Sequence, residues 1–273
     1  MNIDKFSKIV WLIIGSLILF GMILGLCTTV FSIFSFNRYH PDGIEAQIKK
    51  GQENQYILKT VYEMPLLTEG SDFFVVPVSL KKVSKDQETK GAWSRSSDTS
   101  SSWGSGSYSR VDYMGYSFFN GPCHNLIFIN KKSGQAEKLL NERAYIDSVF
   151  FPDKKYLAEE KTKPTFILLE IAKKDTNGDG TINNKDALAG YLVGLDGKGL
   201  TQITPSDTNM VSWRYDQDSK KLFVKVVEDT NGDKKFTEED NEKILIVDTD
   251  KPGMGQELVP EDIKKDIDHV IHQ

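Results

Sequence analysis

The sequence is short of the residue types and motifs on which most catalytic and nucleic-acid-binding sites depend. Its 273 residues include two cysteines and four histidines, and the formal net charge of -5 is only mildly acidic. It contains no Gly-x-Ser-x-Gly elbow, no phosphate-binding loop and no His-Glu-x-x-His motif. No stripe of Lys and Arg stands out either, so we expect no nucleic-acid partner. These absences predict a protein that is not an enzyme.

The two cysteines do not form a disulfide framework. Cys27 lies in an apolar N-terminal run and Cys123 lies far along the chain. Cys123 precedes His124, but two adjacent residues without further Cys or His ligands do not make a zinc site. The pattern favours a small buried thiol beside a loop histidine.

One long apolar run is present near the N-terminus, at residues 9–34, and it carries no charged residue. Crossing the hydrocarbon core takes about 20 residues of helix, whereas the apolar core of a cleaved signal peptide has about 7–15. We therefore expect a cytoplasmic tail and transmembrane anchor at 1–36 and a juxtamembrane linker at 37–55. Lys5 and Lys8 favour a cytoplasmic N-terminus, which places the rest of the chain in the periplasm or outside the cell.

Residues 56–258 have the pattern of a mostly β domain. Short runs of β-branched and aromatic residues recur, bounded by turn residues, and each predicts a strand: 56–62, 72–80, 125–130, 145–151, 165–171, 191–195, 210–215, 222–227 and 244–247. A Ser-rich loop at 94–109 interrupts them. Its neighbourhood holds Trp93, Trp103 and Tyr108, which are either anchors of a binding loop or aromatics that fold back onto the sheet.

The strand pattern repeats along the chain. Each copy has two strands, an acidic loop, a further strand and a turn with Asp, and the acidic loops begin at Asp175 and Asp229, a period of 54 residues (229 − 175). Several strands in each repeat of this length are typical of propeller blades. The region 125–140 reads as a degenerate copy without the acidic loop. The chain holds too few copies to predict ring closure, so a small or incomplete propeller and an open stack of antiparallel sheets both stay open.

A short C-terminal helix is predicted at 259–273. Pro260 suits its first turn and Glu261 suits its N-terminus. Four apolar residues share one face, which is expected to cover a sheet edge: Ile263, Ile267, Val270 and Ile271.

The first acidic loop, 175–186, has the spacing of a calcium ligand set. Calcium binds six to eight hard oxygen ligands, which a twelve-residue loop supplies from positions 1, 3, 5, 7, 9 and 12. Gly180 at position 6 permits the sharp turn. The predicted ligands are Asp175, Asn177, Asp179, the Thr181 carbonyl, Asn183 and Asp186.

The second loop, 229–240, repeats this spacing with one substitution. Lys234 replaces the glycine of the sharp turn, and a non-glycine residue in a left-handed conformation costs on the order of 1 kcal/mol. The second site is therefore expected to be weaker, or Glu239 competes with Asp240 as the last ligand. The predicted ligands are Asp229, Asn231, Asp233, the Lys235 carbonyl, Thr237 and Asp240.

Both loops resemble the Asp-x-Asn-x-Asp calcium loops of the EF-hand superfamily. With Asp at position 12 they are similar to loops of dockerin modules and of bacterial extracellular proteins. Strands rather than helices flank them, which looks like the repeats of Tol-B-type β-propellers. The competing interpretation is a solvated Asp/Asn-rich turn without metal, because these residues favour turns in any case.

These patterns predict a single-pass membrane protein with an extracytoplasmic domain that binds Ca²⁺. The domain is expected to act as a binding or scaffold module, which leaves room for a protein partner, with calcium as a structural staple. Two alternatives stay open: a calcium-responsive regulatory protein, and an enzyme accessory subunit or cryptic hydrolase.

Overall fold

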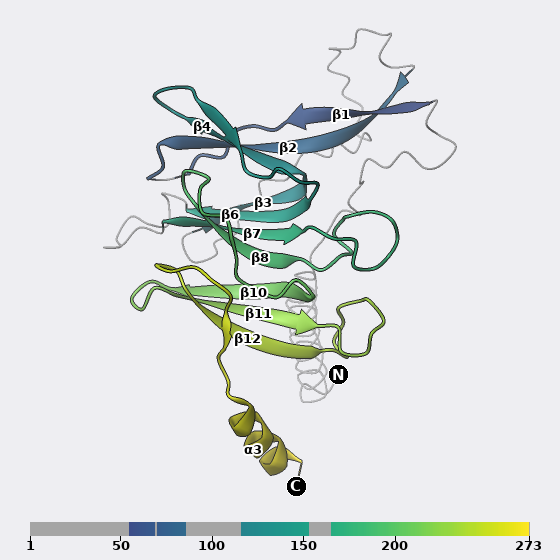
Figure 1. Ribbon diagram of the computed structural model, residues 1–273, viewed down its shortest axis with the longest axis vertical. Helices are drawn as coiled ribbons and strands as arrows, with labels where there is room; N and C mark the ends of the chain where they lie inside the picture. The colour runs from purple at the N-terminus through teal and green to yellow at the C-terminus, as the bar shows by residue number, and fades with distance from the viewer. Residues whose placement is uncertain (1–54, 69, 86–115, 153–164, 273) are drawn as a thin grey trace, which may run out of the picture. The chain divides into compact units, whose positions relative to one another are not determined.

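The computed structural model describes residues 55–68, 70–85, 116–152 and 165–272, all of which belong to one compact unit of the chain, Gly43–Gln273 (Figure 1). The predicted membrane anchor at 1–36, the Ser-rich loop at 94–109 and all but the last residue of the linker predicted at 37–55 lie outside these residues. No helix within the described ranges is long and apolar enough to span a membrane.

The described residues form three antiparallel sheets and one short helix. The first sheet has the order β1-β2-β4-β5, with β1 at Tyr56–Tyr62, β2 at Phe73–Ser84, β4 at Asn125–Asn130 and β5 at Ala136–Lys138. The middle sheet has the order β3-β6-β7-β8-β9, with β3 at Tyr116–Cys123, β6 at Tyr145–Pro152, β7 at Phe166–Ala172, β8 at Ala189–Gly194 and β9 at Thr201–Gln202. The third sheet has the order β10-β11-β12-β13, with β10 at Thr208–Asp216, β11 at Lys221–Glu228, β12 at Asn241–Asp248 and β13 at Gln256–Glu257.

The mostly β, antiparallel class predicted from the sequence is confirmed. Each of the nine predicted runs coincides with a strand to within a few residues. Four strands were not predicted. The short strands β5, β9 and β13 have two or three residues, too few to show a periodicity. The eight-residue strand β3 was missed because Gly121 and Pro122 interrupt its pattern.

Two hydrophobic clusters hold the sheets together, and β7 contributes to both. Ile167 and Leu169 lie in the cluster between the first and middle sheets, with Val75, Leu126 and Phe128 of the first sheet. The alternate residues of β7, Phe166 and Leu168, lie in the cluster with the third sheet, which includes Met210, Trp213, Leu222, Val224 and Leu245. Because both faces of β7 are covered, all seven of its residues are buried, and its sequence shows no alternation.

The turn between β8 and β9 also packs on the first sheet. A Cβ atom placed on Gly197 would lie 2.6 Å from the ring of Phe128, and Gly197 has a φ of 81°. Nearby, the Ser71 hydroxyl donates a hydrogen bond to the carbonyl of Leu195 at 2.9 Å. The turn with Asp expected after the strand at 191–195 is therefore present at Asp196 and Gly197, and its glycine is required both by the backbone and by the contact.

The C-terminal helix α3 runs from Glu261 to Ile271. Its expected packing onto a sheet edge is wrong: none of its residues is buried, and Ile263, Ile267, Val270 and Ile271 are 47–69% exposed. The contact with β13 is polar instead, between Lys264 and Glu257. Helical spacing of apolar residues predicts which residues share a face, but it does not predict what the face contacts.

Candidate metal centre

Both acidic loops connect neighbouring antiparallel strands. The first joins β7 to β8, whose last and first paired residues are Ile171 and Ala189. The second joins β11 to β12, where Glu228 pairs with Asn241. The two loops project from the same side of the unit (Figure 1). The strand–loop–strand context expected from the flanking sequences is thus present at both loops.

The first half of loop 175–186 is built from side-chain acceptors that face the backbone of the same loop. Asp175 accepts hydrogen bonds from the backbone N–H groups of Gly178 at 2.6 Å and Gly180 at 2.8 Å. Asn177 accepts from the N–H of Asp179 at 2.8 Å. Asp179 in turn accepts from the N–H of Thr181 at 2.9 Å and from its hydroxyl at 2.6 Å. These are the local Asx turns that Asp and Asn favour.

Asp186 closes the loop. One of its carboxylate oxygens accepts from the N–H groups of Thr176 at 2.7 Å and Asn177 at 3.2 Å. The other accepts from the N–H of Asn183 at 2.8 Å. The side chain is 1% exposed, so this carboxylate satisfies backbone donors in a place that water hardly reaches. Position 12 therefore fastens the end of the loop to its beginning.

Loop 229–240 repeats this arrangement 54 residues later. Asp229 accepts from the N–H groups of Gly232 at 2.7 Å and Lys234 at 2.9 Å. Asp240 accepts from the N–H groups of Thr230 and Thr237, each at 2.9 Å. Asn231 and Asp233 accept from the N–H two residues further on, as Asn177 and Asp179 do.

The sharp turn at position 6 is left-handed in both loops. The φ of Gly180 is 88° and that of Lys234 is 64°. The strained lysine expected from the sequence is therefore present. Asp240 is 6% exposed and accepts the closing hydrogen bonds, whereas Glu239 is exposed, so Asp240 is the residue that closes the second loop.

Hydrogen bonding lowers the pKa of one carboxyl group in each loop. The Thr181 hydroxyl is the main cause of the lowered pKa of Asp179. The backbone N–H groups of Thr237 and Thr230 lower the pKa of Asp240. Donors that face a carboxylate stabilise its charged form, which is also the form that binds a cation.

The oxygen atoms of each loop are of the type that calcium binds. The carboxylates, however, do not surround a single point. Each loop offers three Asp carboxylates together with amide, hydroxyl or backbone carbonyl oxygens, which are hard ligands. Among the described residues, no three His, Cys, Asp or Glu side chains form a group that could hold a metal ion. In the first loop the carboxylate of Asp186 accepts from backbone N–H groups, whereas Asp175 and Asp179 are exposed.

Position 2 of each loop was not recognised as functional from the sequence. The hydroxyl of Thr176 donates to Asp186 at 3.2 Å and accepts from the N–H of Ala187 at 2.8 Å. The hydroxyl of Thr230 donates to Asp240 at 3.2 Å. The signal was available, because an alignment of the two loops gives the same residue, Thr, at this position.

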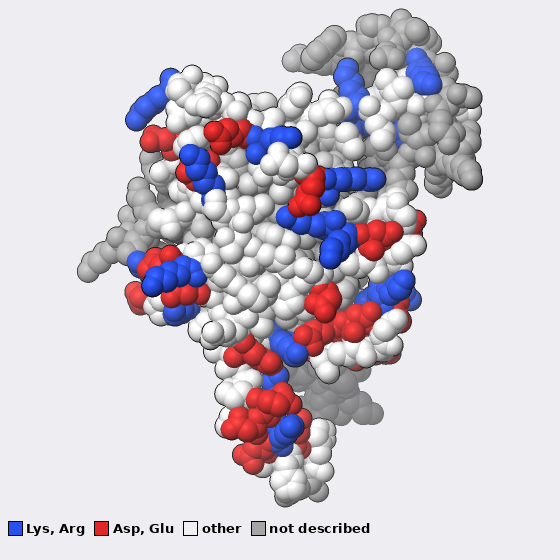
Figure 2. Space-filling model, viewed as in Figure 1, with Lys and Arg blue, Asp and Glu red and all other residues white. Residues whose placement is uncertain are grey.

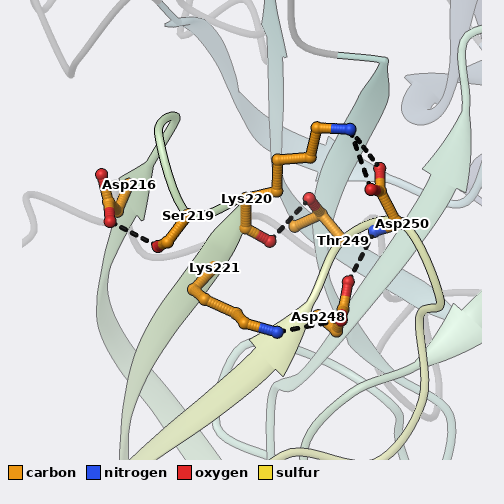
Figure 3. A network of polar contacts seen from close by, with 7 residues as sticks. All are labelled: Asp216, Ser219, Lys220, Lys221, Asp248, Thr249 and Asp250. Carbon is orange, nitrogen blue, oxygen red and sulfur yellow. Dashed lines mark hydrogen bonds and ion pairs between the residues drawn. The ribbon is translucent and has the colours of Figure 1, made fainter.

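The end of the third sheet remote from the second loop is tied by polar contacts (Figure 3). The Lys220 ammonium bonds Asp250 at 2.8 Å, and the Lys220 carbonyl accepts from the N–H and hydroxyl of Thr249. Lys221 bonds Asp248 at 2.9 Å and lowers its pKa. Exposed ion pairs of this kind contribute little to stability.

The pair Cys123 and His124 does not form a metal site with further ligands in the described part of the chain. Cys123 is buried, its thiol donates to the carbonyl of Asn125, and burial raises its pKa to about 12. The His124 ring lies 3.1 Å from the carbonyl oxygen of Ala144. The prediction of a buried thiol is confirmed.

No family model matches the chain, and no curated protein matches it.

Proposed function

We propose that this protein is a membrane-anchored binding or scaffold module whose β domain lies outside the cytoplasm and uses calcium as a structural staple. The observation that carries the proposal is the repeated hydrogen-bond pattern of the two loops. Asp186 and Asp240 accept from equivalent backbone N–H groups, and so do Asp175 and Asp229. The same twelve-residue geometry occurs twice in the chain, which favours a shared function of the two loops over two unrelated solvated turns.

Calcium would be held by oxygens from both ends of each loop. In the first loop these are Asp175, Asn177, Asp179, the Thr181 carbonyl, Asn183 and Asp186, and in the second Asp229, Asn231, Asp233, the Lys235 carbonyl, Thr237 and Asp240. The ion would supply a divalent charge that offsets the repulsion among the carboxylates. The loop residues themselves orient the oxygens through their backbone hydrogen bonds.

A staple is favoured over a sensor by the strands on both sides of each loop. Sensor EF-hands respond to calcium by changing the angle between two helices. Here β7 and β8 are paired up to the loop, and so are β11 and β12. Paired strands with buried neighbours cannot open in this way, so calcium would fix the hairpin ends without changing the fold.

Two further parts of the proposal have separate support. The uncharged run at 9–34 supports the membrane anchor. Four consecutive antiparallel strands, β6 to β9, lie together in the five-stranded middle sheet, and β10 to β13 form the third sheet, which supports an incomplete propeller of blade-like repeats. Calcium sites of extracellular modules bind at about 10⁻⁴–10⁻³ M, so weak sites would be filled outside the cell and nearly empty in the cytosol.

Thermal unfolding of the full-length protein in detergent tests the proposal. Saturating calcium should raise the melting temperature by several degrees relative to EDTA, while the far-UV circular dichroism spectrum stays the same. Magnesium at the same concentration is the control, because Mg²⁺ demands near-octahedral geometry.

Asp175→Ala should remove most of the calcium-linked rise and Asp229→Ala less of it, because the second loop carries Lys234. An identical melting temperature in calcium and EDTA would refute the proposal, and a large spectral change would favour a regulatory switch.

A further inference from the structure

The edge strands of the three sheets differ in how they are protected from pairing with a further strand. An edge strand carries unpaired backbone groups, which proteins shield by keeping the strand short or by placing proline or a bulge in it. The edge strands β5, β9 and β13 have only two or three residues. Strand β3 contains Pro122, and the pairings of β3 and β10 with their neighbours each have a register shift. Five of the six sheet edges in the described part of the chain are therefore shielded.

Strand β1 is the exception. It has seven residues, contains no proline, pairs with β2 without a register shift, and pairs with no other described strand. Its one charged residue is Lys59. The three consecutive residues Leu58, Lys59 and Thr60 are exposed, so both faces of the strand reach the solvent at its middle. The side of β1 away from β2, its free edge, is thus long and regular enough to pair with another strand.

The hydrogen bonds to β2 show which backbone groups of β1 point to the free edge. In an antiparallel pair, alternate residues direct both their N–H and their C=O groups to the partner strand. The N–H of Glu63 donates to the carbonyl of Pro77 at 2.9 Å, and the N–H of Lys85 donates to the carbonyl of Gln55 at 2.9 Å. Because the register has no shift, the odd-numbered residues of β1 face β2. The even-numbered residues face the free edge: Tyr56, Leu58, Thr60 and Tyr62.

The side chains of β1 are complementary to those of a second β1. When two such strands pair antiparallel about a twofold axis at Thr60, even-numbered residues lie opposite even-numbered residues, as the hydrogen bonds require. Leu58 then faces Tyr62 of the second copy, and these side chains are 45% and 66% exposed in the single chain. Lys59 faces Val61, so no lysine lies opposite a lysine. Facing threonines stabilise paired strands, and the burial of exposed apolar side chains adds to this.

Charge also favours β1 as the place where two copies meet. The first and third sheets lie on opposite sides of the middle sheet (Figure 1). Acidic side chains gather over the third sheet and α3, whereas β1 carries no acidic residue (Figure 2). Two copies joined through the third sheet would bring like charges together, and two copies joined through β1 would not.

We propose that the free edge of β1 is a self-association site, at which two copies of this chain pair their β1 strands about Thr60 and join their first sheets into one. The inference is independent of the proposed calcium function, because the acidic loops connect other strands. The three opposed pairs between Leu58 and Tyr62 exchange about six hydrogen bonds. Two paired strands bury less than the roughly 1,200 Å² of a standard interface, so the dimer should be weak and reversible.

Sedimentation equilibrium of the full-length protein in density-matched detergent tests the proposal. Wild type should show a reversible monomer–dimer equilibrium at high micromolar concentration. Thr60→Pro removes an N–H that points to the free edge and none that points to β2. It should therefore weaken the dimer at least about tenfold, while the far-UV circular dichroism spectrum stays the same. Thr60→Val is the matched control, because it keeps the N–H and a β-branched side chain, and it should change the dimer constant less than about threefold.

Disulfide formation tests the register without relying on proline. In a Cys27→Ala background, Thr60→Cys places its thiol at the twofold axis, where facing Cα atoms lie about 5.5 Å apart, within the range of a disulfide. Leu58→Cys is the matched control on the same face of β1, because its two copies would lie four residues apart along the strands, about 14 Å. Cys123 is buried in all of these variants' parent chain.

Mild oxidation should cross-link Thr60→Cys at least about tenfold faster than Leu58→Cys. A mixture of Leu58→Cys with Tyr62→Cys should cross-link between the two unlike chains, because these residues face each other across the axis. Equal rates for Thr60→Cys and Leu58→Cys would overturn the proposed pairing. A wild type that stays monomeric would also overturn it, and so would a Thr60→Pro variant that dimerises as wild type does.

Discussion

Gly180 and Lys234 occupy the same position in the two acidic loops, and both have left-handed backbones, with φ values of 88° and 64°. Each donates its N–H to the Asp that begins its loop, at 2.8 Å and 2.9 Å. Glycine adopts this conformation without penalty, whereas a residue with a Cβ is disfavoured by about 1–2 kcal/mol. The conformation is therefore imposed by the surrounding hydrogen bonds, and the second loop is strained where the first is not.

Replacing Lys234 by glycine should relieve this strain. Relative to Lys234→Gln, which has the same charge as glycine, Lys234→Gly should raise the free energy of unfolding by about 0.5–1 kcal/mol in EDTA. The strain relieved exceeds the greater chain entropy of glycine in the unfolded state. Urea unfolding of the two variants measures the difference. Lys235→Gly compared with Lys235→Gln is the control, and there glycine should be the less stable partner. A glycine variant at position 234 that is no more stable than its glutamine counterpart would contradict the strain.

Asp186 should matter to stability even without calcium. Its carboxylate accepts from the N–H groups of Thr176, Asn177 and Asn183, and it is buried. Asp186→Ala leaves these donors without their acceptor, which should cost about 2–3 kcal/mol in EDTA. Asp179→Ala, at an exposed position of the same loop, should cost less than about 1 kcal/mol. Equal losses in urea unfolding would show that the buried hydrogen bonds of Asp186 contribute no more to stability than the exposed ones of Asp179.

Acid should destabilise the calcium-free protein through Asp240. Its pKa is lowered from 3.8 by the N–H groups of Thr237 and Thr230, so the folded protein binds this proton less readily than the unfolded chain. The resulting stability is fully present above about pH 3.8, the ordinary value, and is lost as pH falls through the lowered pKa. Asp240→Asn should flatten the fall in melting temperature between about pH 5 and pH 2.

Asp218→Asn is the control for the acid experiment, because Asp218 lies exposed in the turn between β10 and β11. It should leave the pH dependence of the melting temperature close to that of the wild type. An Asp240→Asn variant with the wild-type pH dependence would show that the closing carboxylate titrates alike in the folded and unfolded chain.

The sequence predicted the parts of this fold that depend on local pattern. Runs of β-branched and aromatic residues located every strand longer than three residues except β3, and the spacing from Asp175 to Asp186 located a closed loop. It did not predict that Asp186 would be buried and bonded to the backbone, because the ligand pattern reads position 12 only as a metal-binding oxygen. The position of the Lys234 ammonium, 3.2 Å from where a Cβ on Gly178 would lie, could not be predicted either, because it depends on how two hairpins far apart in the sequence are arranged.

The C-terminal helix is a second example in which the sequence predicted a local feature but not its contacts. The positions that share its apolar face followed from helical spacing, and Ile263 and Ile267 do lie on an exposed face. Whether such a face packs on the chain depends on the length and direction of the segment before it. Here β13 has only two residues, Gln256 and Glu257, and the helix after it contacts that strand through Lys264.

The turn at Gly197 offers a test of the packing between the first and middle sheets. A methyl group there would lie 2.6 Å from the Phe128 ring, which is itself buried in the core. Gly197→Ala should therefore lower the free energy of unfolding by about 3 kcal/mol or more, from the clash and the left-handed backbone together. Gly199→Ala is the matched control, because Gly199 has a similar φ of 70° but nothing within 4 Å of its would-be Cβ. It should cost only about 1–2 kcal/mol. Similar losses for the two variants in urea unfolding would show that the turn moves away from Phe128 without cost.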